Sequence, residues 1–480
     1  MTIYQRRQDR ITKWRRLFRP FLPINMLRFR AIWTAFTCLI AGLLTGRGFE
    51  TVNSRRFASR AGMIRWGGDK KKKKRKNRKT LRGKSKLEDS HGYNELEPRQ
   101  LLATLYVGNS DSMLGNTVDF QYDMAADDVS PTGFSAGDTV TWLGADQALG
   151  GTGSDADVTG LEVGLTAFDS IQDAINVAAS GDSVVVAPGF YGESPDIDKS
   201  LDLLSIGGRD VTTIQLQTGS TFLGALTISG AGNDVMVDGF TIAGIDGSGA
   251  TDGTSNIVVE SDLGDVVLQN NRIQVGAAGT NSTGDNGLGL VTFFSTTVDT
   301  NSLTVTDNIF EPLTSEGRRA FYINPGVDEF TFSGNEISGN FTNTSIIQAK
   351  DGLVEENIVT GTGASAGLGT WGNPDASIYG HTTFRANSIS LTGTAISLFE
   401  PADVIVENNF LDGNGTAVAI RDFASGTTNV DVSTVSIFNN SLDSTVGVDN
   451  DYVTPVDAFA NWWGTADDAV ISGTLTSGQV

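Results

Sequence analysis

Asparagine recurs along the second half of the chain, each time just before an apolar residue, and this repeat constrains the fold more than any other feature. Seven copies align on the tetrapeptides NNRI, DNIF, GNEI, ENIV, ANSI, NNFL and NNSL, whose shared residues are Asn271, Asn308, Asn335, Asn357, Asn387, Asn409 and Asn440. Their spacings are 37, 27, 22, 30, 22 and 31 residues, with a mean of about 28. Self-similarity at such a period is typical of a solenoid, in which each repeat adds one coil to a stack.

The repeated asparagine has a structural explanation. Asparagine tolerates the left-handed backbone conformation and can hydrogen-bond its own backbone, so we expect it to occupy a tight bend between two strands. Stacked bends would bring the side chains into a ladder along the stack. At about 28 residues per coil, residues 201–464 provide about nine coils. We therefore expect the asparagines to be structural, not catalytic.

A helix followed by a strand is predicted ahead of the repeats, in FDSIQDAINVAASGDSVVVAPGFYGE at residues 168–193. Asp169 or Ser170 can cap the start of the helix, and Gly181 can end it. One helix face is apolar, with Ile171, Ala174, Ile175 and Ala178. Residues 183–187 follow as a short β-branched strand. Such a unit is suited to cover the open end of a stacked sheet.

This segment closely resembles the N-terminal cap of right-handed parallel β-helices in the pectin-lyase superfamily, where the string IQ-AI-AA-GD-V-V-PG-Y-E leads into the first coil. Near the other end, NWWG at residues 461–464 is similar to the string that closes many of these arrays, and its two tryptophans are expected to lie over the last coil. A further strand usually follows in such relatives, so we expect a C-terminus that is truncated or continued by a partner. The resemblance covers about residues 165–464. It implies an all-β fold, a right-handed single-stranded parallel β-helix, and says almost nothing about activity.

The first 103 residues differ in charge from the rest of the chain. They hold 27 Lys and Arg against 7 Asp and Glu, a net charge of +20, which leaves 8 basic and 49 acidic residues and a net charge of −41 for residues 104–480. The uncharged run at residues 31–46 has 16 residues. That length fits the apolar region of a secretory signal better than a membrane-spanning helix, which needs about 20 residues, although a single membrane anchor is the alternative.

ELEPRQLLA at residues 95–103 resembles a signature, Leu-Glu-x-Arg-x-Leu-Leu-Ala, found near the start of many large exported bacterial surface proteins. In that family it lies soon after the start codon, so Met63 is a candidate for the true start, and processing near Ala103 is expected. The basic run at residues 70–76 suits a targeting or disordered arm, with a nucleic-acid or membrane-surface contact as the alternative.

We therefore divide the chain into four parts. Residues 1–103 form a basic export region that is disordered or removed, and residues 104–165 an irregular, β-rich lead-in with strands expected at residues 104–107 and 138–143. Residues 166–200 hold the capping helix and first strand, and residues 201–480 hold the coils.

Composition excludes several kinds of site. Cys38 is the only cysteine and lies in the basic region, so the acidic part has no disulfide, no cysteine-bound metal and no catalytic thiol. His91 and His381 are the only histidines, which excludes a multi-histidine metal centre. A net charge of −41 also repels a phosphate backbone, so we expect no nucleic-acid partner.

The strands near the bends allow a prediction of one outer face. Aligned by the repeat, they are AFYIN, IIQAK, SIYGH, AISLF and AVAIR, at residues 320–324, 346–350, 377–381, 395–399 and 417–421. One alternating set is apolar and is expected to face the core. The other set would form two outward columns, one containing Tyr322 and Tyr379 and the other containing Lys350, His381, Phe399 and Arg421. Chance is the alternative explanation, since eight cations are spread over about nine coils.

Aromatic and cationic groups on a flat face suit sugars, because sugar rings stack on aromatic rings while Lys or Arg holds a carboxylate or sulfate. The candidate substrate-binding residues are Tyr322, Lys350, Tyr379, His381, Phe399 and Arg421. We expect an exported surface or extracellular protein that binds a polysaccharide or cell-surface glycan or acts in adhesion. A membrane would be contacted only through an uncleaved N-terminal segment.

The alternative is a carbohydrate-active enzyme, a calcium-assisted polysaccharide lyase or an epimerase that acts on uronate-containing polymers. Lys350 or Arg421 would then be the base, and Tyr379 or His381 the acid. No acidic cluster aligns with these residues, and no known catalytic set of this fold transfers residue by residue. Catalytic residues are therefore not assigned, whether the chain is an enzyme is open, and no cofactor is expected, with calcium as an option for the enzyme.

Overall fold

The computed structural model describes residues 102–108, 120–122, 135–142, 158–216, 224–244, 255–276, 288–292, 299–314, 316–372, 381–422, 432–465 and 475–477. The chain divides into two units, Met1–Asn94 and Glu95–Val480, and all described residues lie in the second. The predicted basic arm, with its apolar run, lies outside the described residues. Among the described residues, no helix is long and apolar enough to cross a membrane.

The first sheet has twelve strands, in the order β30-β28-β26-β24-β21-β18-β15-β12-β9-β6-β1-β5. Every paired neighbour in it is parallel. Its strands are β1 (Thr104–Val107), β5 (Ala167–Phe168), β6 (Ser183–Val186), β9 (Leu201–Ser205), β12 (Val235–Asp238), β15 (Asp265–Gln269), β18 (Thr300–Thr306), β21 (Val327–Ser333), β24 (Asp351–Glu355), β26 (His381–Arg385), β28 (Ile405–Glu407) and β30 (Ser436–Phe438).

The second sheet has 17 strands and consists of two parallel ladders that run side by side. The middle ladder holds β7 (Gly189–Tyr191), β10 (Thr212–Gln215), β13 (Thr241–Ala243), β16 (Arg272–Val275), β19 (Ile309–Pro312) and β22 (Glu336–Ser338). The last ladder holds β8 (Asp196–Ile197), β11 (Gly224–Ile228), β14 (Ser255–Val259), β17 (Leu288–Thr292), β20 (Arg319–Ile323), β23 (Ser345–Ile347), β29 (Thr416–Arg421), β31 (Val446–Asn450) and β32 (Leu475–Ser477). The long strands β25 (Ile358–Trp371) and β27 (Ser388–Phe399) run through both ladders.

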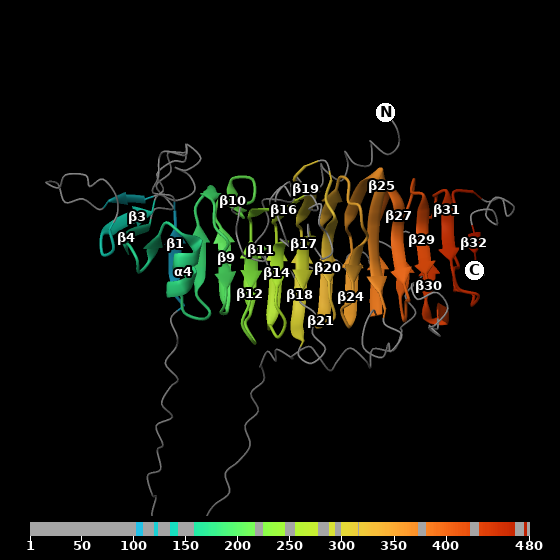
Figure 1. Ribbon diagram of the computed structural model, residues 1–480, viewed down its shortest axis with the longest axis horizontal. Coiled ribbons are helices and arrows are strands. Elements are labelled where there is room, and N and C mark those ends of the chain that lie inside the picture. The colour runs from blue at the N-terminus through green and yellow to red at the C-terminus, as the bar shows by residue number, and fades with distance from the viewer. Residues whose placement is uncertain are drawn as a thin grey trace, which may run out of the picture. The chain divides into compact units, whose positions relative to one another are not determined.

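The chain winds through the three ladders in turn, so that β12, β13 and β14 are followed by β15 beside β12. Each circuit from β6 to β23 therefore adds one strand to each ladder. Figure 1 shows the strands in chain order along the stack, from green to red. Parallel pairing between successive circuits is the defining feature of a β-helix. The predicted all-β parallel β-helix is confirmed.

The asparagine ladder is present where the repeat predicts it. Each repeated asparagine from Asn271 to Asn440 donates its backbone N–H to the Oδ1 of the next asparagine, over 2.8–3.1 Å. Its Nδ2 also donates to a backbone carbonyl of the preceding coil. Asn461 receives the last of these bonds and extends the ladder into the NWWG segment. All seven predicted members are buried.

The prediction that asparagine itself takes the left-handed conformation is wrong. That conformation belongs to the residue before it, with φ of 53° at Asn270, 55° at Asp307, 67° at Gly334, 57° at Glu356 and 55° at Ala386. Asn408 and Asn439 repeat the pattern at 58° each. The asparagine is buried and uses its amide for the ladder, because an unpaired backbone N–H inside the stack would cost a hydrogen bond.

The core lies between the three ladders and is continuous along the stack. Every second residue of a strand is apolar and points into the core. In β15, for example, Val266 and Leu268 are buried and Asp265 is exposed. Four rings, Phe310, Phe321, Phe330 and Phe332, pack together from three neighbouring strands with centroids 4.7–6.5 Å apart.

The predicted helix is present as α4 (Ile171–Val177), with Ser170 as its N-cap and Ile171, Ala174 and Ile175 buried. It ends at Ala178, which takes an extended backbone, three residues before Gly181. Glu193 accepts from the hydroxyl of Ser170 and from the N–H groups of Ile171 and Gln172, so it closes the helix N-terminus. The helix contacts β1, β5, β6 and β8. Its role as a cover for the end of the stack stays a prediction.

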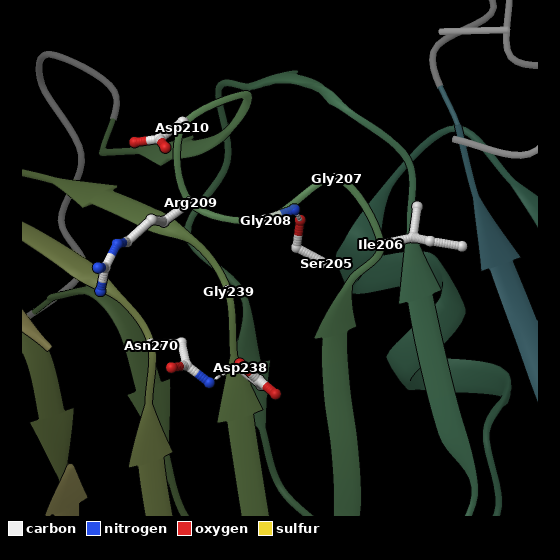
Figure 2. Close-up of a pocket in the computed structure, with 9 residues that line it drawn as sticks. All are labelled: Ser205, Ile206, Gly207, Gly208, Arg209, Asp210, Asp238, Gly239 and Asn270. Atoms are coloured by element: carbon white, nitrogen blue, oxygen red, sulfur yellow. Dashed lines mark hydrogen bonds between the residues drawn. The ribbon is translucent and has the colours of Figure 1, made fainter. Parts of the chain in front are cut away.

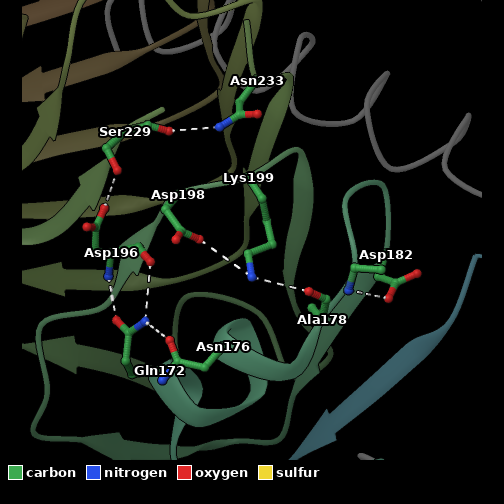
Figure 3. Close-up of polar contacts among 10 residues, drawn as sticks. Gln172, Asn176, Ala178, Asp182, Asp196, Asp198, Lys199, Ser229 and Asn233 are labelled. Atoms are coloured by element: carbon green, nitrogen blue, oxygen red, sulfur yellow. Dashed lines mark hydrogen bonds and ion pairs between the residues drawn. The ribbon is translucent and has the colours of Figure 1, made fainter. Parts of the chain in front are cut away.

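Polar side chains join α4 to the first coils (Figure 3). Gln172 exchanges two hydrogen bonds with the backbone of Asp196, whose carboxylate accepts from Ser229 over 2.7 Å. Lys199 donates to the carbonyl of Ala178, and Asp182 accepts from the backbone N–H groups of Ala179 and Ala103. These hydrogen bonds hold α4 in a fixed position against the first coils.

The lead-in contains the two expected strands. β1 pairs with β6 in the first sheet. β2 (Phe120–Tyr122), β3 (Thr139–Trp142) and β4 (Val158–Glu162) form a small antiparallel sheet, with Val140 and Trp142 buried against Leu161 and Ala187. At the other end, Trp463 packs against the core while Trp462 is 53% exposed. The packing of Trp463 agrees with the predicted two-tryptophan lid, and the lid itself stays a prediction. A 3-10 turn, η3 (Val432–Thr434), precedes β30.

Candidate functional site

Aromatic and charged side chains gather at the corner where strands of the last ladder end and strands of the first sheet begin. Trp371, Phe399 and Arg421 are the final residues of β25, β27 and β29, and they pair in register, Trp371 with Phe399 and Phe399 with Arg421. We name these three residues the corner strip. All three are half-buried. Since the strands are about 4.8 Å apart, they form a continuous row on the surface.

The local sequences explain why these side chains meet. In β27 the residues Ile396 and Leu398 are fully buried, and in β29 Val418 and Ile420 are as well. Phe399 and Arg421 directly follow these buried pairs as the last residues of their strands, and by strand alternation their side chains point outwards. The rings of Trp371 and Phe399 are 5.9 Å apart and tilted by 42°. Together they present apolar ring surface at the corner.

Carboxylates surround the strip. Trp371 Nε1 donates to Glu400 Oε2 over 3.3 Å, and Glu400 is only 5% exposed. Arg421 Nη1 lies 2.6 Å from Asp449 Oδ2 and 3.1 Å from Asp451 Oδ1. The guanidinium of the strip is thus already balanced by two acids.

Tyr452 donates its hydroxyl to the backbone carbonyl of Arg421 over 3.3 Å. Burial raises the pKa of this phenol, and the negative charges of Asp422, Glu400 and Asp451 raise it further. The phenol therefore stays protonated at neutral pH and acts there as a hydrogen-bond donor.

The predicted alignment of outward columns is wrong for SIYGH. His381 begins β26 and pairs with Asp351 in the first sheet, and Tyr379 lies outside the described residues. The strand of the last ladder in this coil is the end of β25, where Gly369 pairs with Ser397 and Thr370 with Leu398. Lys350 likewise precedes β24 and belongs to the first sheet, since its N–H donates to the Val327 carbonyl. Lys350, His381 and Arg421 therefore do not share one column.

Part of the predicted face is retained. Phe399 and Arg421 are neighbours in register. Tyr322, in β20, donates its hydroxyl to Gln348 Oε1 over 3.1 Å, and the Arg319 guanidinium lies 5.0 Å from the centre of its ring. Trp371 was missed, although Leu-Gly-Thr-Trp at residues 368–371 has the same alternation as Ile-Ser-Leu-Phe at residues 396–399. Treating the residues between Trp371 and His381 as an insertion would have aligned residues 368–371 with residues 396–399 in the last ladder.

Lys350 is held by two acids of preceding coils, one just before β18 and one in β21. Its Nζ forms hydrogen-bonded ion pairs with Asp299 and Asp328. These hydrogen bonds, to Asp299 first and Asp328 second, raise the pKa of the ammonium group well above its usual range. A lysine that keeps its proton is a poor general base, so these contacts disfavour Lys350 in the role that a lyase would require.

His381 also lies between carboxylates at the same corner. Its Nδ1 is 3.8 Å from Asp351 Oδ1, and its Nε2 is 3.5 Å from Asp403 Oδ2. Asp351 and Asp403 are the partners of His381 on the two adjacent coils. No group of three or more His, Cys, Asp or Glu side chains that could hold a metal ion occurs among the described residues. Calcium stays a prediction of the enzymatic alternative.

A concave region lies at the next corner, after the first-sheet strands β9, β12 and β15 (Figure 2). It encloses about 380 Å³ and is lined by Ser205, Ile206, Gly207, Gly208, Arg209, Asp210, Asp238, Gly239 and Asn270. Arg209 donates to the carbonyls of Asp307 and Asn271 on later coils. Asp238 accepts from Gln269 and Asn270. Its charged groups thus hold neighbouring bends together.

Comparison with known proteins adds little to this geometry. No protein-family model matches the chain, and no curated protein matches it. Among solved structures, the A-module of the mannuronan C-5 epimerase AlgE6 of Azotobacter vinelandii matches with 17% identity and a TM-score of 0.39, over 61% of this chain and 89% of that one. A pectin methylesterase mutant in complex with a hexasaccharide matches with 16% identity and a TM-score of 0.30, over 47% of this chain and 76% of that one.

Proposed function

We propose that this chain binds glycans and that the corner strip is its sugar-contacting surface. The observation that carries the proposal is the register of Trp371, Phe399 and Arg421, which sets two rings and a guanidinium in one row on successive coils. Sugar rings present apolar faces that stack on aromatic side chains, and their hydroxyls accept and donate hydrogen bonds at the rim. A row on a repeating frame suits a polymer better than a single small molecule.

The proposal is tested with Trp371→Ala and Phe399→Ala in the full chain. A glycan array first identifies a bound oligosaccharide, and calorimetric titration then compares the variants. Each truncation should weaken binding by about tenfold, which corresponds to about 1.4 kcal/mol. Phe410→Ala is the matched control, because Phe410 is 58% exposed and pairs with Ser388 in the middle ladder, away from the strip. Unchanged affinity in both strip variants would refute the assignment.

An exported, surface-associated or extracellular location completes the proposal. It is supported by the basic start and the 16-residue uncharged run at residues 31–46, together with the acidic, lysine-poor composition that follows. Sequencing the N-terminal residue of protein recovered from outside the producing cell tests both export and processing. Recovery of the uncleaved chain from the cell interior would contradict it.

A further inference from the structure

Cations at the corner share one arrangement, in which each lies between two carboxylates. Arg421 contacts Asp449 and Asp451, and Lys350 contacts Asp299 and Asp328. His381 lies between Asp351 and Asp403. With histidine neutral, the three groups carry net charges of −1, −1 and −2, and Glu400 adds another negative charge beside Trp371.

This arrangement opposes the binding of acidic sugars. A uronate or sulfate could reach Arg421 or Lys350 only by displacing an aspartate that already fills the contact, which would leave that aspartate unpaired beside a second anion. The surrounding chain adds to the effect, because residues 104–480 carry a net charge of −41. The corner therefore attracts positive charge.

Exposure of the acids makes them accessible to a ligand. Side-chain exposure is 35% for Asp451, 58% for Asp403 and 75% for Asp351. A primary ammonium group on a sugar can donate to such carboxylates, and it is also attracted to the faces of Trp371 and Phe399. At the strip itself, Glu400 contacts Trp371 and Asp451 contacts Arg421. Aromatic surface and carboxylates thus lie together there and match the two surfaces of an amino sugar, its apolar ring face and its charged amine.

We infer that the corner strip selects glycans with free amino groups over neutral or acidic ones. The inference rests on the proposed glycan-binding function and specifies its ligand class. It reverses the role that the sequence indicated for the cations, since Arg421 and Lys350 position carboxylates here and do not hold a sugar acid.

The test uses three hexasaccharides of similar length at pH 6: β-1,4-linked glucosamine, its fully N-acetylated form, and galacturonate. Calorimetric titration of the full chain should give at least tenfold tighter binding of the glucosamine hexamer than of the acetylated one, and no measurable binding of the galacturonate. Raising NaCl from about 20 mM to about 500 mM should reduce the advantage of the amine, since salt screens exposed charges.

Asp451→Asn should reduce the ratio of glucosamine affinity to acetylated-hexamer affinity by about threefold or more, because only the glucosamine hexamer carries an ammonium group for this carboxylate to contact. Glu336→Gln is the control, an exposed acid on β22 in the middle ladder, and should change nothing. Equal affinities for amine and acetylated hexamers, or tighter galacturonate binding lost in Trp371→Ala, would overturn the selectivity and keep the glycan site. Absence of binding by all three hexamers and by a glycan array would overturn the proposed function itself.

Discussion

At the scale of single residues, each bend after the first-sheet strands from β15 to β30 is made by two neighbours with different tasks. The first residue takes positive φ and is exposed, while the second is the buried asparagine. Glycine occupies the first position at Gly334, and alanine occupies it at Ala386. Left-handed backbone costs a non-glycine residue about 1–2 kcal/mol, so the two sites differ in strain at the same structural position.

Exchanging the two residue types should therefore have opposite effects. Gly334→Ala should lower the free energy of unfolding by about 1 kcal/mol, because φ is 67° and the new Cβ would lie 2.7 Å from Asp307 Oδ1. Ala386→Gly should raise it by several tenths of a kcal/mol, since the relief of strain is partly offset by unfolded-state entropy. Urea denaturation followed by circular dichroism measures both. Shifts of the same sign would contradict this account of the bend.

At the scale of elements, the asparagine ladder links each coil to the next with buried hydrogen bonds. Asn387 accepts from the N–H and Nδ2 of Asn357, and it donates to the Val354 carbonyl and to Asn409 Oδ1. Removing the amide leaves an N–H and a carbonyl unpaired in the interior, and each such group costs about 1–3 kcal/mol.

Asn387→Ala should thus destabilise the stack by roughly 3 kcal/mol or more. Asn461→Ala is the comparison, since Asn461 makes the same kinds of contact at the end of the ladder but is only partly buried, so water can replace its bonds. It should cost less than half as much. Thermal unfolding of both variants measures the difference, and equal losses would show that position in the ladder is irrelevant.

The ladder was predictable because one side chain type recurs for one physical reason. The seven asparagines can be found in the sequence because each occurs in the same short pattern with apolar residues. The helix at Ile171–Val177 can be found from its apolar face and its serine cap. The corner strip was harder to predict from the sequence. Its register depends on whether SIYGH or LGTW continues the last ladder, and both strings alternate. Choosing SIYGH places His381 in the last ladder, although it belongs to the first sheet, and the alternating apolar pattern is kept with either choice.

Carboxylate partners of the cations were beyond sequence reasoning for a different reason. Asp299 and Lys350 are 51 residues apart, and Arg421 and Asp451 are 30 apart. Only the stacking of coils brings them together. The sequence shows that only eight basic residues lie in residues 104–480, but it could not show that Lys350 and Arg421 form ion pairs with aspartates.

At the scale of the whole molecule, the surplus of acid shapes stability as well as selectivity. Exposed acidic side chains lie at or near the start of several first-sheet strands, at Asp265 in β15, Glu329 in β21 and Asp351 in β24. Glu329 and Asp351 are directly paired on adjacent strands. Like charges in this arrangement repel one another and weaken the native state.

Salt should therefore stabilise the folded chain. Between about 20 mM and about 500 mM NaCl, the Tm should rise by several degrees, because the Debye length falls below the spacing of strands. Sucrose at equal osmolality is the control that separates charge screening from general exclusion of solutes. A Tm that stays constant or falls with NaCl would contradict a dominant repulsion.

Because the buried asparagine and the exposed residue before it have different roles at each bend, the surface carries a regular set of positions whose residue type can vary. Asparagine, acidic, glycine and alanine residues all occur at these positions, yet all take the same backbone conformation and all face solvent. The positions are Asn270, Asp307, Gly334, Glu356, Ala386, Asn408 and Asn439. Because the adjacent amide secures the turn, their side chains are free to differ. They lie along one edge of the stack, about 4.8 Å apart, so that groups attached to them would be displayed at regular intervals.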